Sequence, residues 1–222
     1  VCALALAACG KSKPEENKAG AASPVAASAI KQEAAYKYSL TDGFDLCASK
    51  LKSKLGDAIK ISDLSASYTV PDDISSVPSV HKVTKGGDLQ HCDLKMQNPE
   101  NAKKLVGYEL NTQTDEIKGP IPVEITVRGG DAEKFNLNNS VFSIGSINFA
   151  AAQATVDGLK PKLEAKFSKY QISRVSVMQD IFSGKAEIRV AIDGILKAND
   201  VKKNIWMTIT ADGKKITAGE FK

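Results

Sequence analysis

Four cysteines and two histidines are the residues of this sequence with the greatest chemical reactivity. Cys2 and Cys9 lie within the first ten residues, and Cys47 and Cys92 lie in the body of the chain. His81 and His91 are the only histidines. Any zinc site or histidine-based catalysis would therefore have to use one or both of them.

The histidines do not predict a site of that kind. No Cys-x-x-Cys or His-x-x-x-His spacing is present, and such spacings are typical of zinc sites. His91 adjoins Cys92 on a predicted strand, where neighbouring side chains point to opposite faces and cannot act as base and nucleophile together. Gly-x-Ser-x-Gly, phosphate-loop and HExxH motifs do not occur. We predict no catalytic, cofactor-binding or metal-binding residue.

The first ten residues are typical of secretion. Residues 1–8 are small and apolar, and the run is far shorter than the roughly 20 residues that span a bilayer. We interpret them as the end of a signal peptide whose start is missing. The segment Leu6-Ala7-Ala8-Cys9 resembles the lipobox of bacterial lipoproteins.

The lipobox resemblance implies a lipid anchor. In that family the cysteine accepts diacylglycerol and becomes the first residue of the mature protein, so Cys9 would carry the lipid and Cys2 would leave with the signal. Several acyl chains would give stable membrane attachment. Gly10 stands where an Asp favours the inner membrane in enteric-type lipoproteins, which implies the outer membrane. An ordinary cleaved leader with an unlipidated Cys9 is the alternative.

Residues 9–36 predict a flexible stalk, because they consist mainly of Lys, Glu, Ala, Ser, Gly and Pro. Residues 37–222 are enough for one domain or two small ones. Outside the cytoplasm thiols tend to oxidise, and Cys47 falls on a predicted helix while Cys92 falls on a predicted strand. We therefore expect a disulfide between them that joins helix to sheet.

Apolar periodicity predicts the elements of the first unit, residues 37–135. A helix of about 14 residues starts near Phe44, with Asp42 as its cap and Gly56 as its end. Alternating polar and apolar residues predict strands over 64–70, 92–96, 106–110 and 121–127. Pro120 and Pro122 cannot donate ladder hydrogen bonds, which predicts an edge position for the last strand.

The second unit, residues 136–222, repeats this order. A shared helical face is formed by Ala152, Val156, Leu159, Leu163 and Phe167. Pro161 predicts a break that divides this helix in two. Strands are predicted over 172–177, 186–192, 205–210 and 214–218, with a hairpin turn at Asp212-Gly213.

These elements predict an α+β fold with antiparallel sheets, each packed by one or two helices. Residues 103–117 align with 202–216 at an offset of 99, and residues 61–66 align with 172–177 at an offset of 111. The alignments leave two alternatives open, a tandem duplication or coincidence of similar patterns. The layout resembles beta-lactamase-inhibitor-protein-like folds in the order of elements only, which transfers no functional residue.

The charge pattern excludes one class of partner. The net charge of +4 is a small difference between 30 basic and 26 acidic residues, and Arg128, Arg174 and Arg189 are the only arginines, so we predict no nucleic-acid binding. Lysines gather on or beside the predicted helices, where a solvated face is favoured over contact with anionic polymer; they are Lys50, Lys54, Lys160, Lys162, Lys166 and Lys169. For Trp206, core packing is favoured over anchoring a partner.

The leading hypothesis is an envelope lipoprotein that presents a non-enzymatic binding module to an unknown protein or envelope polymer. The alternative is an inhibitor or protective factor against an enzyme or toxin, with the loop from Pro71 to Gly87, which carries Asp72 and Asp73, as its inserting element. A hydrolase that uses His81 or His91 is the third and least favoured function.

Overall fold

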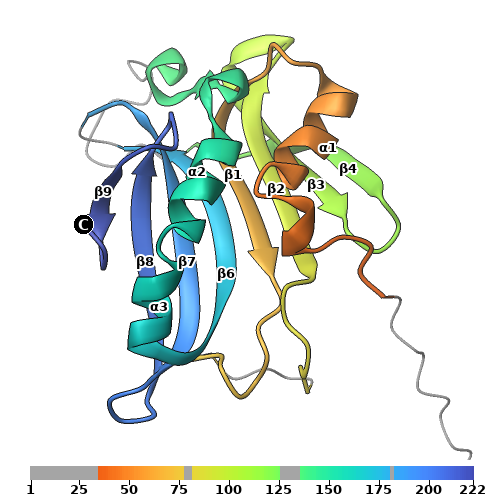
Figure 1. Ribbon diagram of the computed structural model, residues 1–222. Coiled ribbons are helices and arrows are strands. Elements are labelled where there is room, and N and C mark those ends of the chain that lie inside the picture. The colour runs from red at the N-terminus through yellow and green to blue at the C-terminus, as the bar shows by residue number, and fades with distance from the viewer. Residues whose placement is uncertain (1–34, 78–81, 126–135, 181–182) are drawn as a thin grey trace, which may run out of the picture. The chain divides into compact units, whose positions relative to one another are not determined.

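The described part of the chain folds around one antiparallel sheet. The computed structural model describes residues 35–77, 82–125, 136–180 and 183–222. In these residues the strand order is β4-β3-β2-β1-β6-β7-β8-β9, and the two-residue strand β5 (Phe142–Ser143) pairs beside β1. Figure 1 shows the sheet with its helices packed on one face.

The described residues of 37–135 supply one α-helix and four long strands, all placed close to their predicted positions. They are α1 (Leu46–Leu55), β1 (Lys60–Tyr68), β2 (Leu89–Asn98), β3 (Asn101–Asn111) and β4 (Glu116–Val123). A short 3-10 helix, η1 (Leu40–Asp42), precedes α1. Strand β4 lies at the edge of the sheet, as its prolines predict. It begins earlier than predicted, and Thr126 and Val127 lie outside the described residues.

The described residues of 136–222 supply two α-helices and, besides β5, four more strands. They are α2 (Phe149–Asp157), α3 (Lys160–Lys166), β6 (Phe167–Gln179), β7 (Ala186–Leu196), β8 (Lys202–Thr210) and β9 (Ile216–Gly219), preceded by the 3-10 helices η3 (Leu137–Ser140) and η4 (Ile144–Ser146). The predicted break is confirmed, because Pro161 lies in the first turn of α3. Phe167 starts β6 instead of extending the helix, and its side chain is buried.

The start of α1 differs from the prediction. The Asp42 carboxylate accepts a hydrogen bond from the Ser39 amide at 2.7 Å and so closes η1, instead of capping the longer helix. Gly43 follows with φ of +106°, which interrupts helical backbone, and α1 begins only at Leu46. Gly56 ends the helix as predicted.

The expectation of more than one sheet is wrong. The two predicted units meet where β1 pairs with β6, and this antiparallel pair runs from Asp63 opposite Met178 to Ser67 opposite Arg174. The units therefore share one continuous sheet, because the innermost strand of each finds its second partner in the other.

The hydrophobic core lies between the helices and one face of this sheet (Figure 1). Strand residues that face the helices are buried and apolar, among them Leu64, Ala66, Leu94, Val190 and Met207. The predicted disulfide is present: Cys47 of α1 bonds to Cys92 of β2, with 5.5 Å between their Cα atoms. It fixes α1 on the first half of the sheet.

Candidate functional site

The sheet face opposite the helices carries polar side chains in ordered rows, and none of the described helices covers it. One row follows the strand pairing through His91, Ser67, Arg174, Ala191 and Trp206, from β2, β1, β6, β7 and β8 in turn. Neighbouring strands lie about 4.8 Å apart, so this row spans roughly 19 Å. We call this surface the open face.

Charged side chains of both signs lie on the open face. The first half contributes Asp63, Asp93 and Glu109 together with Lys95, and Asp93 lies directly opposite Glu109. Burial raises the pKa of Asp63, and burial together with Glu109 raises the pKa of Asp93. The second half contributes Arg174 and Arg189 together with Glu187. The open face therefore carries charge of both signs on each half.

Trp206 is the largest apolar group on the open face. It is 44% exposed, and the Arg189 guanidinium carbon lies 5.0 Å from the centre of its ring. Its neighbours Ile205 and Met207 are buried on the opposite face. The favoured prediction of core packing is therefore wrong, because strand alternation places Trp206 on the side without helices.

A cleft of about 660 Å³ lies on this face, beneath the chain that follows β1. Its walls come from the segment 69–77 and from strands of both halves, and they include Ser67, Val77, Arg174, Ala191, Asp193 and Asn204. Its lining includes both polar and apolar side chains. A pocket with a few convergent polar groups on an apolar background is a common form of ligand site.

Three contacts hold the segment 69–77 over the second half of the sheet. The Ser76 hydroxyl donates to Asp193 of β7 at 2.8 Å. The Asp73 carboxylate pairs with Lys169 of β6 at 2.8 Å, and Lys202 of β8 donates to the Asp72 carbonyl oxygen at 2.6 Å. The cleft is thus built by a segment of the first half that is fixed to three strands of the second.

Contacts of this segment also engage the two acidic residues of the predicted inserting loop. The Asp72 side chain accepts a hydrogen bond from the Val83 amide at 2.9 Å, and Asp73 is in its ion pair. Both carboxylates are thus engaged within the molecule. His81 and the rest of the segment 78–81 lie outside the described residues.

The two charged side chains in the cleft differ in their environment. Asp193 is only 6% exposed, and its two oxygens accept hydrogen bonds from Ser76 and from the Asn204 amide group at 3.0 Å. Arg174 is exposed, and its Nε donates to the Ser67 hydroxyl at 3.2 Å. No described carboxylate forms an ion pair with Arg174. Sequence reasoning missed this arrangement, because it depends on the pairing of β1 with β6.

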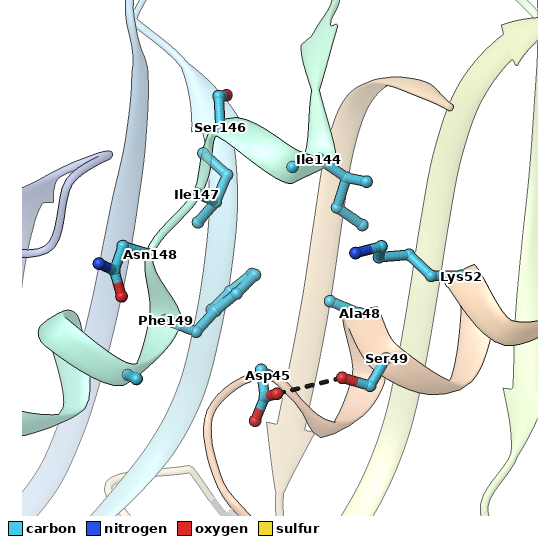
Figure 2. A pocket seen from close by; sticks show the side chains of 11 residues that line it. Asp45, Ala48, Ser49, Lys52, Ile144, Ser146, Ile147, Asn148 and Phe149 are labelled. Atoms are coloured by element: carbon cyan, nitrogen blue, oxygen red, sulfur yellow. Dashed lines mark hydrogen bonds between the residues drawn. The ribbon is translucent and has the colours of Figure 1, made fainter. Parts of the chain in front are cut away.

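Figure 2 shows a second cleft on the helix side, between α1 and the segment that leads into α2. Its volume is about 340 Å³, and buried apolar residues such as Ile144 and Phe149 line it. At its rim the Ser49 hydroxyl donates to Asp45 at 3.1 Å, while Lys52 pairs with Asp57 at 3.0 Å. Its charged groups already have partners, so this cleft is chemically poorer than the one on the open face.

The remaining sequence predictions fall into three groups. His91 is exposed while Cys92 is buried in the disulfide, so the predicted separation of these side chains is confirmed. No cluster of potential metal ligands occurs among the described residues. Cys9, the stalk to residue 34, and Arg128 lie outside them.

Most of the helix lysines contact other groups of the protein. Lys50 pairs with Asp115, Lys160 with Glu164, Lys166 with Glu220 and Lys169 with Asp73. Lys54 donates to the Ile117 carbonyl oxygen at 3.4 Å. These contacts favour the solvated-face interpretation over an anion-binding surface.

No family model, no curated protein and no solved structure matches the chain. In the described part of the chain, no helix is both long enough and apolar enough to cross a membrane. Function has to be argued from the chain's own residues.

Proposed function

We propose that this protein is a bacterial envelope lipoprotein, anchored through Cys9, whose folded part is a non-enzymatic binding module. The lipobox residues Leu6-Ala7-Ala8-Cys9 support the anchor, and Gly10 favours the outer membrane. The Cys47–Cys92 disulfide supports an address outside the cytoplasm, since such bonds persist in oxidising compartments. The partner is a protein or polymer of the envelope.

The open face is the proposed binding surface, and the observation that carries this proposal is the exposed pair of Trp206 and Arg189. Tryptophan and arginine are the residues most enriched among those that dominate binding energy at protein interfaces. Here they lie side by side on a sheet face free of the described helices, beside a cleft. A surface of this composition suits recognition of another macromolecule.

The anchor is tested by mass spectrometry and membrane fractionation of a precursor with a complete signal peptide. Cys9→Ala should abolish both the lipid mass and membrane attachment. Cys2→Ala is the matched control, because Cys2 leaves with the signal peptide and its loss should change neither. A soluble wild type without lipid would refute the anchor.

The binding surface is tested by cross-linking in intact cells. A photo-reactive residue in place of Lys95, on the open face, should capture a partner, and Trp206→Ala should abolish that capture. The same photo-reactive residue in place of Lys162, on α3, is the control, and it should capture none of the molecules that are captured from position 95. Equal capture from both positions would show that the open face is not the specific surface.

We also infer that the two halves arose by tandem duplication. The strands read outward in the same order on both sides of the β1–β6 pair, β1-β2-β3-β4 on one and β6-β7-β8-β9 on the other. At the middle of that pair Ser65 lies opposite Ser176. These serines are 111 residues apart, which is the offset at which residues 61–66 and 172–177 align.

The strand register extends this correspondence to β3 and β8, whose sequences align with each other separately from those of β1 and β6. Asp93 lies opposite Ser65, and Arg189 lies opposite Ser176. Glu109 lies opposite Asp93, and Thr208 lies opposite Arg189. Glu109 and Thr208 thus hold equivalent places and are 99 residues apart, the same offset at which residues 103–117 align with 202–216. Chance resemblance gives no reason for this agreement.

A self-alignment of sequences related to this chain tests the duplication. The two halves should match at offsets of 111 for β1 with β6 and 99 for β3 with β8. A best match at other offsets would favour coincidence of two similar patterns.

A further inference from the structure

We propose that the cleft on the open face binds a peptide segment of the partner through a carboxylate, and that Arg174 holds this group. The inference rests on the proposed function and names the chemistry of what the binding module recognises. The carboxylate is either the C-terminus of the peptide or an acidic side chain within it.

Arg174 has the donors for this role. A guanidinium carries five N–H groups in a fixed planar arrangement, which suits bidentate recognition of a carboxylate. Only its Nε–H has a partner among the described residues, the Ser67 hydroxyl at 3.2 Å. That bond orients the group, and no described residue accepts a hydrogen bond from its two terminal nitrogens, while Arg174 itself lines the cleft.

No described acidic residue that lines the cleft pairs with Arg174. Asp193 is the other charged residue of its wall, and both of its oxygens already accept hydrogen bonds, from Ser76 and Asn204. Asp63 lies near enough for the charge of Arg174 to lower its pKa, yet burial dominates and raises that pKa, and the two form no ion pair. Among the described residues Arg174 therefore has no ion-paired carboxylate, and it can offer its positive charge to an incoming anion.

The surroundings fit a peptide better than a free inorganic anion. Val70, Val77 and Val83 line the cleft, and Val77 is 70% exposed, so an apolar side chain next to the carboxylate would gain burial. Gln90 also lines it and can hydrogen-bond the main chain of a peptide. Trp206 lies beyond Ala191 in the same cross-strand row and offers a further apolar contact.

Trp206 also provides the measurement, because it is the only tryptophan of the chain. The full-length protein in detergent is titrated with three tripeptides, and binding is followed by tryptophan fluorescence. The first is acetyl-Ala-Leu-Leu with a free C-terminus, the second is the same peptide as its C-terminal amide, and the third is acetyl-Ala-Glu-Leu amide. The pair of leucine peptides differs only in the carboxylate.

We expect saturable binding of a carboxylate peptide and none of the leucine amide. Preference for the first peptide identifies a C-terminal carboxylate, and preference for the third identifies an acidic side chain. Arg174→Gln should weaken binding by about tenfold or more, because it removes a charge-assisted pair. Arg174→Lys should recover part of the affinity, since lysine keeps the charge but not the two parallel bonds.

Lys162→Gln is the matched control, because it removes an exposed cation of α3, away from the open face, and should leave the affinity within about twofold. Equal binding of acid and amide, an unchanged affinity in Arg174→Gln, or no binding by any peptide would overturn the inference. If the peptides fail while a partner is still captured from position 95, the proposed function stands and only its ligand chemistry is wrong. If capture fails as well, both fall.

Discussion

At the scale of single residues, two tyrosines in the first half of the protein differ in whether their hydroxyl groups form a hydrogen bond. Tyr68 is buried, and its hydroxyl has no hydrogen-bond partner among the described residues. Tyr38 is half-buried, and its hydroxyl accepts a hydrogen bond from Lys50 at 2.6 Å. A buried hydroxyl without a partner costs free energy, whereas a paired one contributes about 0.5–1.5 kcal/mol.

Replacing each tyrosine by phenylalanine should therefore have opposite results. Tyr68→Phe should leave the free energy of unfolding unchanged or raise it, because it removes only an unpaired polar group. Tyr38→Phe should lower it by about 0.5–1 kcal/mol, because the Lys50 ammonium loses the acceptor that Tyr38 provides and keeps only Asp115. Urea denaturation at neutral pH measures both, and a clear loss of stability in Tyr68→Phe would show that its hydroxyl has a partner.

Tyr68 also predicts a pH dependence. Burial raises its pKa from 10.0 to about 12 in the folded protein, with Asp42 and Asp45 acting in the same direction. The unfolded chain loses this proton first, so between about pH 10 and 12 the folded state binds more protons and its stability falls as the pH rises. In Tyr68→Phe the free energy of unfolding should fall less steeply across this window. Equal slopes for both proteins would contradict the raised pKa.

Asp193 accepts one of the three contacts that hold the segment 69–77. Asp193→Ala should lower the free energy of unfolding by about 1–3 kcal/mol, because it leaves Ser76 and Asn204 without their acceptor. Glu100→Ala, at an exposed turn, is the control and should change it by less than about 0.5 kcal/mol. If the two variants are equally stable, Asp193 does not fix this segment.

At the scale of elements, the turn between β8 and β9 is packed against the start of α2. Gly213 has φ of +75°, and a Cβ placed there would lie 2.4 Å from the Ala152 nitrogen and 2.6 Å from the Asn148 oxygen. Its own carbonyl accepts a hydrogen bond from Thr155 at 2.6 Å. The turn is thus a packing contact as well as a connection.

Gly213→Ala should consequently cost more than backbone strain alone. Gly56 provides the comparison, because it has φ of +90° but no atom within 4 Å of its built Cβ. Gly56→Ala should lower the free energy of unfolding by about 1–2 kcal/mol, and Gly213→Ala by clearly more, because main-chain atoms must also move. Thermal or urea unfolding of both variants measures the difference. Equal losses would mean that α2 moves away from the added methyl group at little cost in free energy.

The sequence was sufficient for most elements and insufficient for the site, for a physical reason. Helix and strand periodicity is local, so the break at Pro161, the turn at Asp212-Gly213 and the edge position of β4 could be predicted. The place of Arg174 beside Asp193 depends on β1 pairing with β6 and on a segment held across three strands. Such contacts join residues far apart in sequence and leave no local pattern.

At the scale of the whole molecule, the continuous sheet predicts one cooperative unfolding transition. The disulfide lies in the first half, where its removal perturbs stability, and Trp206 lies in the second half, where its fluorescence reports unfolding. Reduction, or the double variant Cys47→Ala with Cys92→Ala, should lower the free energy of unfolding by about 3–4 kcal/mol. Tryptophan fluorescence and circular dichroism should report the same shift, since the halves share the β1–β6 pair. An unshifted fluorescence transition would mean that the halves unfold separately.

The prolines of β4 have a consequence for how these molecules can crowd together. A sheet edge with free main-chain donors can accept a strand from a neighbouring copy, and this is a common start of aggregation. Neither Pro120 nor Pro122 can donate a main-chain hydrogen bond to such a strand, and at the other edge β9 has only four residues. On the proposed membrane, where anchored copies diffuse in two dimensions and meet often, both edges would thus resist growth of the sheet from one molecule into the next.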